Sequence, residues 1–278
     1  MIQEIEPHLY RNEYIPTPPD KDSIALYFEE HTVLLKNTAE GIEFPRFKDL
    51  GDLNKEIYRD YTYLFSVDGE RYYLLGEVDA ERMSPFTLEN TEIFRRADPQ
   101  YRAFAGITGY QLYSWYRDNK YCGRCGCSMH KDKKERMMHC RKCGNMVYPK
   151  ISPAVIIGVL DGNRILMSKY AGRVYRNYAL IAGFVEIGEM LEETVKREVM
   201  EEVGLKVKNI RYYRSQPWSF SETILMGFYC DLDGEDAITL EEDELALAEW
   251  FDRKDIPVVP SRDSLTNEMI IKFKNGKI

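Results

Sequence analysis

The stretch GFVEIGEMLEETVKREVMEEVGL, residues 183–205, organises the rest of the chain. It begins with a glycine loop, and the segment that follows predicts an amphipathic helix. At about 100° per residue, four aliphatic side chains fall on one apolar stripe. The stripe consists of Leu191, Val195, Val199 and Val203. Glu198, Glu201 and Glu202 project together along its edge, so a helix docked on a core would hold three acids at the rim of that core.

Three carboxylates at helical spacing need a counter-ion. Side chains at positions i, i+3 and i+4 are neighbours on a helix, and like charges there reduce stability unless a cation lies between them. A hard divalent ion with oxygen ligands, Mg²⁺ or Mn²⁺, suits such a set. The alternative is a solvated acidic helix face without a ligand.

The residues around these acids decide between the two interpretations. The segment fits the pattern G-x5-E-x7-R-E-U-x-E-E-x-G-U, where U is a bulky aliphatic residue. The specified positions are Gly183, Glu189, Arg197, Glu198, Val199, Glu201, Glu202, Gly204 and Leu205. This pattern resembles the Nudix box, a loop–helix–loop that hydrolyses a diphosphate linked to another moiety. The resemblance implies that Glu189, Arg197 and the three acids form the catalytic centre.

Two further expectations concern the box itself. The flanking glycines, Gly183 and Gly204, suit backbone that turns sharply beside a bound phosphate. Glu193 and Arg197 lie at i and i+4 and predict an ordinary helix ion pair. In the Nudix family the box arginine also pairs with the acid that corresponds to Glu189.

Composition sets the limits of the fold and the partners. The 278 residues suffice for two domains and a small module. A net charge of −8 and a pI near 5.3 argue against broad adhesion to nucleic acid or to an anionic membrane. No apolar run approaches the roughly 20 residues of a membrane span. The first residues lack the features of a signal peptide, so we expect a cytoplasmic protein.

The N-terminal third has no recognisable catalytic motif. Residues 61–76 alternate around Asp68-Gly69 and predict a β-hairpin. Asp98 and Pro99 predict an N-cap and a first-turn proline for a helix that runs through residues 109–119. This part predicts a modest α+β domain.

Six cysteines follow different patterns. Two Cys-x2-Cys pairs, fourteen residues apart, have the spacing of a tetrahedral zinc ribbon. The four ligands are Cys122, Cys125, Cys140 and Cys143. Four thiolates leave no open position, so the zinc is expected to be structural. Cys127 could compete with Cys125, but we expect it to be a surface thiol. His130 and His139 are expected in loops, and Cys230 in a buried strand.

The third section combines strands with helices. Two apolar runs meet at Asp161-Gly162 and predict a second hairpin. Further strands are predicted at residues 179–184, 210–213, 224–231 and 247–251, and a final helix at 265–273. This mixture predicts a sheet covered on both faces, in agreement with the Nudix α/β/α sandwich. We expect an α/β protein with three parts: an N-terminal α+β domain (1–118), a zinc ribbon with four cysteine ligands (119–148) and a Nudix hydrolase domain (149–278).

A stretch beyond the box narrows the substrate. Residues 215–221, SQPWSFS, resemble the SQPWPFPxS signature of NADH pyrophosphatases of the NudC type. A proline-stiffened turn with Trp218 and Phe220 could offer flat surfaces to a nicotinamide or adenine ring; the alternative is that these aromatics fill the core. Ser219 and Ser221 replace two prolines of the signature, and Thr223 replaces its last serine. We therefore expect a less rigid loop and a less strict preference for dinucleotides.

The resemblance covers residues 107–278 and implies a set of roles. It implies a substrate site at Tyr148, Phe184, Gln216, Pro217, Trp218, Ser219, Phe220, Ser221, Glu222 and Thr223, and more loosely at Thr266. It implies Mg²⁺ or Mn²⁺ ligands at Glu198, Glu201, Glu202, the carbonyl of Ala182, and Glu244. The local register also admits Asp243 or Glu242 in place of Glu244. It further implies a homodimer.

The expected activity is metal-dependent hydrolysis of NAD(H) to nicotinamide mononucleotide and AMP. Removal of NAD caps from RNA 5′ ends involves the same bond, and residues 131–136, KDKKER, are a candidate RNA patch, with a solvated loop as the alternative. Broader Nudix activity on ADP-ribose or dinucleoside polyphosphates is an enzymatic rival. A nucleotide-sensing regulator is the non-enzymatic one, but regulatory relatives commonly lose box acids, and all are present here.

Overall fold

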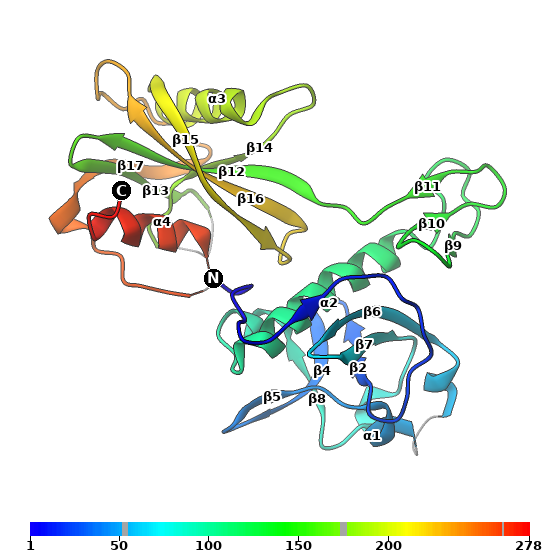
Figure 1. Ribbon diagram of the computed structural model, residues 1–278. Helices are drawn as coiled ribbons and strands as arrows, with labels where there is room; N and C mark the ends of the chain where they lie inside the picture. The colour runs from blue at the N-terminus through cyan, green and yellow to red at the C-terminus, as the bar shows by residue number, and fades with distance from the viewer. Residues whose placement is uncertain (52–54, 173–176, 263) are drawn as a thin grey trace. The chain divides into compact units, whose positions relative to one another are not determined.

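The computed structural model describes residues 1–51, 55–172, 177–262 and 264–278, and Figure 1 shows their course. The chain divides into two compact units. One contains Ile2–Lys150 together with Ser219–Ser221, and the other contains Met1, Ile151–Trp218 and Glu222–Ile278. Among the described residues, none of the helices combines the length and the apolar character needed to cross a lipid bilayer.

The first unit contains two four-stranded sheets and one long helix, α2. The first sheet has the order β1 (Tyr10–Arg11), β6 (Tyr61–Val67), β7 (Glu70–Leu75) and β2 (Ile24–Leu26). The second comprises β3 (Phe28–Glu29), β4 (Thr32–Thr38), β5 (Gly41–Glu43) and β8 (Thr87–Asn90). The helical segments are α1 (Phe47–Gly51), η1 (Lys55–Tyr58), η2 (Ala80–Arg82), η3 (Thr91–Arg95) and α2 (Gln100–Asp118).

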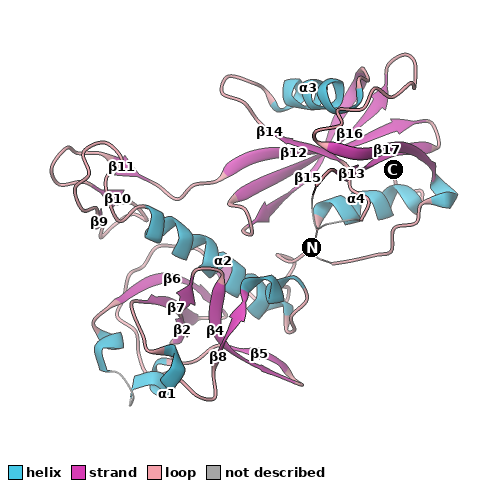
Figure 2. Ribbon diagram, turned by 180° about the vertical axis from the view of Figure 1, so that it is seen from behind, coloured by secondary structure: helices cyan, strands magenta, loops and turns pink. Residues whose placement is uncertain are grey.

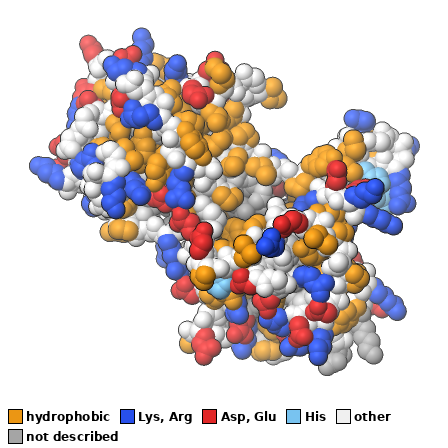
Figure 3. All heavy atoms as spheres, viewed as in Figure 1, with side chains coloured by type: hydrophobic (Ala, Val, Ile, Leu, Met, Phe, Trp, Pro, Cys, Tyr) orange, Lys and Arg blue, Asp and Glu red, His pale blue; other side chains and the backbone are white. Residues whose placement is uncertain are grey.

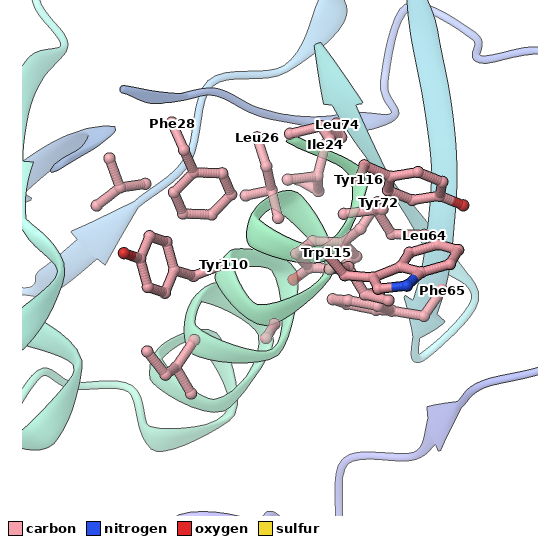
Figure 4. Packing of buried hydrophobic residues seen from close by; sticks show 14 of the residues in the cluster. Ile24, Leu26, Phe28, Leu64, Phe65, Tyr72, Leu74, Tyr110, Trp115 and Tyr116 are labelled. Carbon is pink, nitrogen blue, oxygen red and sulfur yellow. The ribbon is translucent and has the colours of Figure 1, made fainter. Parts of the chain in front are cut away.

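The core of this unit forms around α2. Figure 4 shows Tyr110, Trp115 and Tyr116 of α2 directed toward side chains of the strands, among them Leu26 and Phe65. At Gly109 the helix approaches the sheet so closely that an added Cβ would lie 2.4 Å from Leu26 Cδ1. The glycine therefore permits the close packing of helix and sheet.

The sequence predicted the hairpin of this unit correctly and misplaced the helix cap. Asp68 and Gly69 have φ values of 52° and 83° between β6 and β7, as a tight hairpin turn requires. The N-cap of α2 is Pro99, with extended backbone and no side-chain cap bond, so the expected cap at Asp98 is wrong by one residue.

The cysteine-rich segment folds as a small three-stranded antiparallel sheet. Its order is β11 (Met146–Val147), β10 (Met138–His139) and β9 (His130–Lys131). His130 and His139 face each other in the register of β9 and β10, so the expectation that they lie in loops is wrong. Cys127 is half-buried, not the surface thiol that the sequence suggested.

The second unit is built on a six-stranded mixed sheet. Its strands are β12 (Ser152–Asp161), β13 (Arg164–Tyr170), β14 (Ile181–Phe184), β15 (Val207–Trp218), β16 (Thr223–Leu232) and β17 (Leu245–Asp252). The order is β15-β16-β12-β13-β17, and β14 also pairs with β12. β12 and β16 are parallel, and the other pairs are antiparallel. A short turn, η4 (Arg253–Asp255), follows β17.

Two helices cover the two faces of this sheet, as Figure 2 shows: α3 (Leu191–Val203) and α4 (Leu265–Lys274). Successive side chains of a strand point to opposite faces. Accordingly Val155 and Ile157 of β12 pack in the core beneath α3, while Ile156 packs in the core beneath α4. The α/β/α sandwich predicted from the sequence is confirmed.

The stretch expected to be a proline-stiffened turn is partly strand. Gln216, Pro217 and Trp218 form the end of β15, where Pro217 pairs with Ile224 and Trp218 with Thr223 of β16. β15 is an edge strand, so a proline without an N–H is tolerated there. The turn itself is confined to residues 219–222.

Candidate active site

The helix that carries the box acids has defined ends. Glu193 accepts a hydrogen bond from the Met190 N–H at 2.9 Å, which satisfies one of the free amides of the first turn. Gly204 ends the helix with φ 70°, in the left-handed conformation that favours glycine. The glutamate at position 193 therefore caps α3, and the predicted Glu193–Arg197 ion pair is wrong.

Arg197 instead joins the loop before α3 to the acids on the helix. Its Nε donates to Glu189 Oε1 at 2.6 Å, and its Nη2 donates to Glu189 Oε2 at 3.0 Å. Nη1 donates to Glu198 Oε1 at 2.7 Å and to Glu201 Oε2 at 2.9 Å. Nη2 also donates to the carbonyl of Phe184 at 3.0 Å. One guanidinium thus fixes three carboxylates and the end of β14.

Glu189 is held in its charged form. Besides Arg197, it accepts hydrogen bonds from the Glu186 N–H at 3.1 Å and from Thr194 Oγ1 at 2.9 Å. The hydrogen bonds from Arg197, with those from Glu186 and Thr194, lower the pKa of Glu189 to about 2. Sequence reasoning missed Thr194, because a threonine inside a helix has no distinctive spacing signal.

The pKa of Glu198 is shifted in the opposite direction to that of Glu189. Burial raises the pKa of its carboxyl group, while Arg197 lowers it, and the negative charges of Glu201 and Glu244 raise it further. The carboxyl group lies against Gly183, where an added Cβ would be 1.9 Å from Glu198 Cδ. Gly183 has no positive φ and belongs to β14, so its role is to leave space for Glu198 and not to turn the chain. In the box loop, Gly188, with φ 95°, is the glycine in the left-handed region.

The three box acids differ in exposure and are not gathered into one tight cluster. Glu202 is 2% exposed, Glu198 is 8% exposed, and Glu201 is exposed. Within the described part of the chain, only the four cysteines form a set of metal-binding side chains whose ligand atoms all lie within 4.8 Å. Arg197 contacts Glu198 and Glu201 and so provides positive charge between them.

The other two predicted metal ligands, Glu244 and Ala182, are both connected to Glu198. Glu244 is exposed, and its charge acts on Glu198, which supports its choice over Asp243 and Glu242. Ala182 lies on β14, paired with Ile156, immediately before the glycine against which Glu198 packs. The roles of Ala182 and Glu244 as ligands stay predictions.

The predicted substrate residues are not all brought together. Phe184 is 56% exposed at the end of β14, and its backbone carbonyl accepts a hydrogen bond from Arg197. Gln216 is completely buried, and its Oε1 accepts from the Leu265 N–H at 2.7 Å, so its side chain anchors the start of α4. Trp218 lies two residues further on the same strand face, and Thr266 lies in the first turn of α4.

The other predicted substrate residues are those of the turn after β15 and Tyr148. Ser219, Phe220 and Ser221 group with the first unit. Glu222 adopts φ 54°, and its carbonyl accepts from Ser152, while Thr223 is buried at the start of β16. Tyr148 is exposed in the first unit and donates to Glu135 at 2.8 Å. Substrate contacts by these residues stay predictions.

The four cysteines form a second centre in the first unit. Cys122 and Cys143 Sγ are 3.5 Å apart, as are Cys125 and Cys140 Sγ. The two Cys-x2-Cys segments form matching turns. The Gly126 N–H donates to the Cys122 carbonyl at 2.8 Å, and the Gly144 N–H donates to the Cys140 carbonyl at 2.9 Å. Four converging sulfur atoms fit a tetrahedral Zn²⁺ with a closed coordination shell.

Comparisons with known proteins agree with these two centres. A family model for the NUDIX domain matches residues 150–270, and one for the NADH pyrophosphatase zinc ribbon domain matches residues 117–148. A crystal structure of a NUDIX hydrolase from Nitrosomonas europaea has a TM-score of 0.50 and 22% identity, and the likeness covers 57% of this chain and 92% of that one. The chain therefore contains a Nudix domain, preceded by a zinc ribbon domain of the NADH pyrophosphatase type.

Relatives named "NAD-capped RNA hydrolase NudC" are similar to more than half of this chain. The protein of Klebsiella pneumoniae is 40% identical over 174 residues, which cover 62% of this chain and 66% of the relative. The protein of Escherichia coli O9:H4 is 40% identical over 162 residues, which cover 58% and 63%. The chain thus matches slightly less than two thirds of the length of these relatives.

Replacing Gly183 by alanine should displace the predicted metal ligand Glu198 without changing any acid. The new methyl group would occupy the position of the Glu198 carboxyl group, which would have to move. Because misplacing a ligand typically costs 10–100-fold in metal affinity, we expect Mn²⁺ binding to fall by roughly that factor in calorimetric titration. Gly123→Ala, at a glycine with open space around it, is the control. Unchanged Mn²⁺ affinity in Gly183→Ala would contradict the assigned packing.

The Glu189 network predicts a defined pH dependence of stability. The folded-state pKa of about 2 lies below the ordinary 4.5, so the stabilisation is complete above pH 4.5 and is lost as the pH falls towards 2. In metal-free buffer, Glu189→Gln should lower the urea midpoint at pH 7, and this difference from wild type should narrow below pH 4.5. Glu192→Gln, at an exposed acid of the same helix, should cause little change at either pH. A deficit of Glu189→Gln that is independent of pH would exclude the ionic network as its cause.

Zinc content distinguishes the four predicted ligand cysteines from the nearby Cys127. Cys125→Ser should reduce the zinc content, measured by elemental analysis, from about one equivalent to nearly none, and should lower the melting temperature, because metal binding contributes directly to folding. Cys127→Ser should retain zinc, since Cys127 is not in the four-sulfur cluster. Loss of zinc from Cys127→Ser and retention in Cys125→Ser would reverse the assignment.

Proposed function

We propose that this protein hydrolyses the pyrophosphate bond of NAD(H) in a divalent-metal-dependent reaction. Water is added across the phosphoanhydride, and the products are nicotinamide mononucleotide and AMP. The observation that carries the proposal is the pair of buried acids on α3, Glu198 and Glu202, in a Nudix domain that follows an NADH pyrophosphatase zinc ribbon. Arg197 holds Glu198.

The donor set of α3 fits a hard divalent cation. All side-chain donors are carboxylates, and the buried Glu198 lies within the field of two other negative charges. A cation there would relieve this repulsion and favour the charged form of Glu198. Glu198, Glu201 and Glu202 would hold Mg²⁺ or Mn²⁺, together with Glu244 and the Ala182 carbonyl. When bound, the ions would neutralise the diphosphate and lower the pKa of the attacking water.

The chain's own residues would prepare this reaction. Arg197 orders Glu198 and Glu201 and connects them to the loop residue Glu189, so the acids are positioned before substrate arrives. Glu202 faces the sheet side of the helix and is nearly inaccessible to solvent. It would either accept the proton of the attacking water or serve only as a metal ligand. The exposed Phe184 ring would stack on a base of the substrate.

Removal of NAD caps from RNA is part of the same proposal. The scissile bond is identical, and the relatives from Klebsiella and Escherichia are named as NAD-capped RNA hydrolases. A capped 5′ end and free NAD(H) would therefore use the same carboxylates. Preference between these two substrates would depend on contacts with the RNA chain.

The oligomeric state and the location of the protein are further parts of the proposal. We propose a homodimer with the substrate near the subunit interface; three exposed apolar side chains in or next to the box loop, Phe184, Ile187 and Met190, support an interaction surface in this region. Light scattering after size exclusion would test the subunit number. We also propose a cytoplasmic location, supported by a Cys₄ metal cluster and by six cysteines that form no disulfide among the described residues.

The Glu202→Gln variant tests the mechanism. The amide keeps the size of the side chain but removes its charge, so kcat for Mg²⁺-dependent NADH cleavage should fall roughly 10²–10³-fold, as for loss of one electrostatic stabiliser. Glu192→Gln, which removes an exposed charge of the same helix, should retain activity. Products would be identified by chromatography. Near-normal cleavage by Glu202→Gln would refute the assigned role.

A panel of substrates separates the proposal from its rivals. NADH, NAD, ADP-ribose and dinucleoside polyphosphates would be compared with Mg²⁺ and with Mn²⁺. The highest kcat/KM should belong to the nicotinamide dinucleotides. Faster cleavage of ADP-ribose or of dinucleoside polyphosphates would favour the broader activity, and no cleavage of any of them would favour a regulator.

A further inference from the structure

The zinc ribbon has a charge opposite to that of the whole protein. Residues 117–148 contain nine Lys and Arg and three Asp and Glu, a net charge of +6, whereas the whole chain carries −8. In Figure 3 the ribbon shows Lys and Arg side chains in blue beside pale-blue histidine. A basic module in an acidic protein attracts polyanions to one place only.

Six of these basic side chains are available to a ligand. They are exposed and have no ion pair with any described residue. They are Lys120, Arg124, Lys133, Lys134, Arg141 and Lys142. Surface cations elsewhere in the protein often have acidic partners, such as Lys208 with Asp233. These six ribbon cations therefore lack an ion-pair partner among the described residues.

The cysteine cluster gathers three of these cations. Arg124 lies between the two cysteines of the first knuckle, and Arg141 and Lys142 lie between those of the second. Because all four sulfur atoms lie within 4.8 Å of one another, the two knuckles face each other across the ion site. The three basic residues are therefore concentrated at one end of the ribbon, and we call Arg124, Arg141 and Lys142 the knuckle cations.

An exposed aromatic ring accompanies the knuckle cations. Tyr121 immediately precedes the first knuckle, and its side chain is 68% exposed, although its neighbour Cys122 is buried. Its backbone forms a bridge with Ser128, which fixes its position at the base of the knuckle. Cations that follow a phosphate chain, combined with an exposed aromatic face for stacking, are characteristic of single-stranded nucleic acid binding.

The candidate patch at residues 131–136 needs correction. The ammonium group of Lys131 contacts Thr62 and lies 5.6 Å from the centre of the Tyr116 ring. Arg136 donates to the Leu64 carbonyl at 2.5 Å and lies over the Tyr14 ring at 5.3 Å. These two residues attach the ribbon to the rest of its unit. Lys133 and Lys134 of that segment are exposed and make no comparable contact with the described residues.

We propose that the zinc ribbon is a binding surface for single-stranded RNA, with phosphates on the knuckle cations and a base on Tyr121. The inference rests on the proposed function, since it provides a place for the RNA portion of a capped substrate. Specificity for a base sequence is not expected, because both contacts tolerate any base. An anionic membrane fits less well, since surface binding to lipid favours an amphipathic helix and the ribbon consists of short strands and turns.

The test uses the full-length protein and an uncapped single-stranded RNA of about 20 nucleotides, enough to span one binding site. The triple variant Arg124→Gln, Arg141→Gln, Lys142→Gln should bind this RNA roughly tenfold more weakly in fluorescence anisotropy at low salt. Loss of three phosphate contacts should reduce the slope of log K against log salt by about 2. The control Lys206→Gln, Lys254→Gln, Lys277→Gln removes the same charge from exposed positions of the other unit and should leave binding unchanged.

Stacking is tested separately. Tyr121→Ala should weaken RNA binding roughly tenfold, and Tyr121→Phe should retain it, because the aromatic face is kept. Zinc content and melting temperature confirm that each ribbon variant is folded. Hydrolysis of free NADH should be unaffected by all of them, and the relative rate on NAD-capped RNA should fall with RNA affinity.

Several results would overturn the inference. Equal loss of RNA affinity in the knuckle and control variants would make the effect one of net charge. Unchanged affinity in zinc-loaded knuckle variants would exclude the surface, and binding to phosphatidylserine vesicles without binding to RNA would assign it to lipid. Because uncapped RNA binding is measured without catalysis, failure here is distinct from failure of the wild-type protein to cleave NADH.

Discussion

The contact between Glu198 and Gly183 is the constraint on which the active centre depends. A carboxyl group on a helix can lie against a strand only where the strand has no side chain, and an added Cβ at Gly183 would be 1.9 Å from it. Burial there raises the pKa of Glu198, so a nearby cation would stabilise the charged form of its carboxyl group. Arg197 supplies one positive charge, and its remaining hydrogen bonds hold the loop before the helix.

The sheet makes this contact possible. Alternating side chains of β12 pack beneath α3 on one face and beneath α4 on the other, so both helices are held by the same strand. Val195, Val199 and Val203 are fully buried, which fixes the rotation of α3 about its own axis. That rotation places Glu198 and Glu202 toward the sheet and leaves Glu201 in solvent.

The basic residues of the ribbon fall into two groups, those that contact the rest of the unit and those that remain exposed. Lys131 and Arg136 hold the ribbon against its neighbours through hydrogen bonds and aromatic rings. The knuckle cations have no comparable partners among the described residues and stay exposed. A structural ion between the knuckles would thus serve both to fold a segment with few buried side chains and to hold these cations at one end.

The sequence by itself determined the elements and the chemistry: the box acids, the two Cys-x2-Cys pairs, both hairpins and the sandwich follow from spacing and periodicity, which are local. Tertiary structure decided which groups meet. Arg197 forms an ion pair with Glu189 of the preceding loop and none with Glu193, because Glu193 caps the helix. Gly183 provides space and not a turn, and the buried Gln216 anchors α4. These choices depend on contacts between distant segments, and helix or strand periodicity carries no information about such contacts.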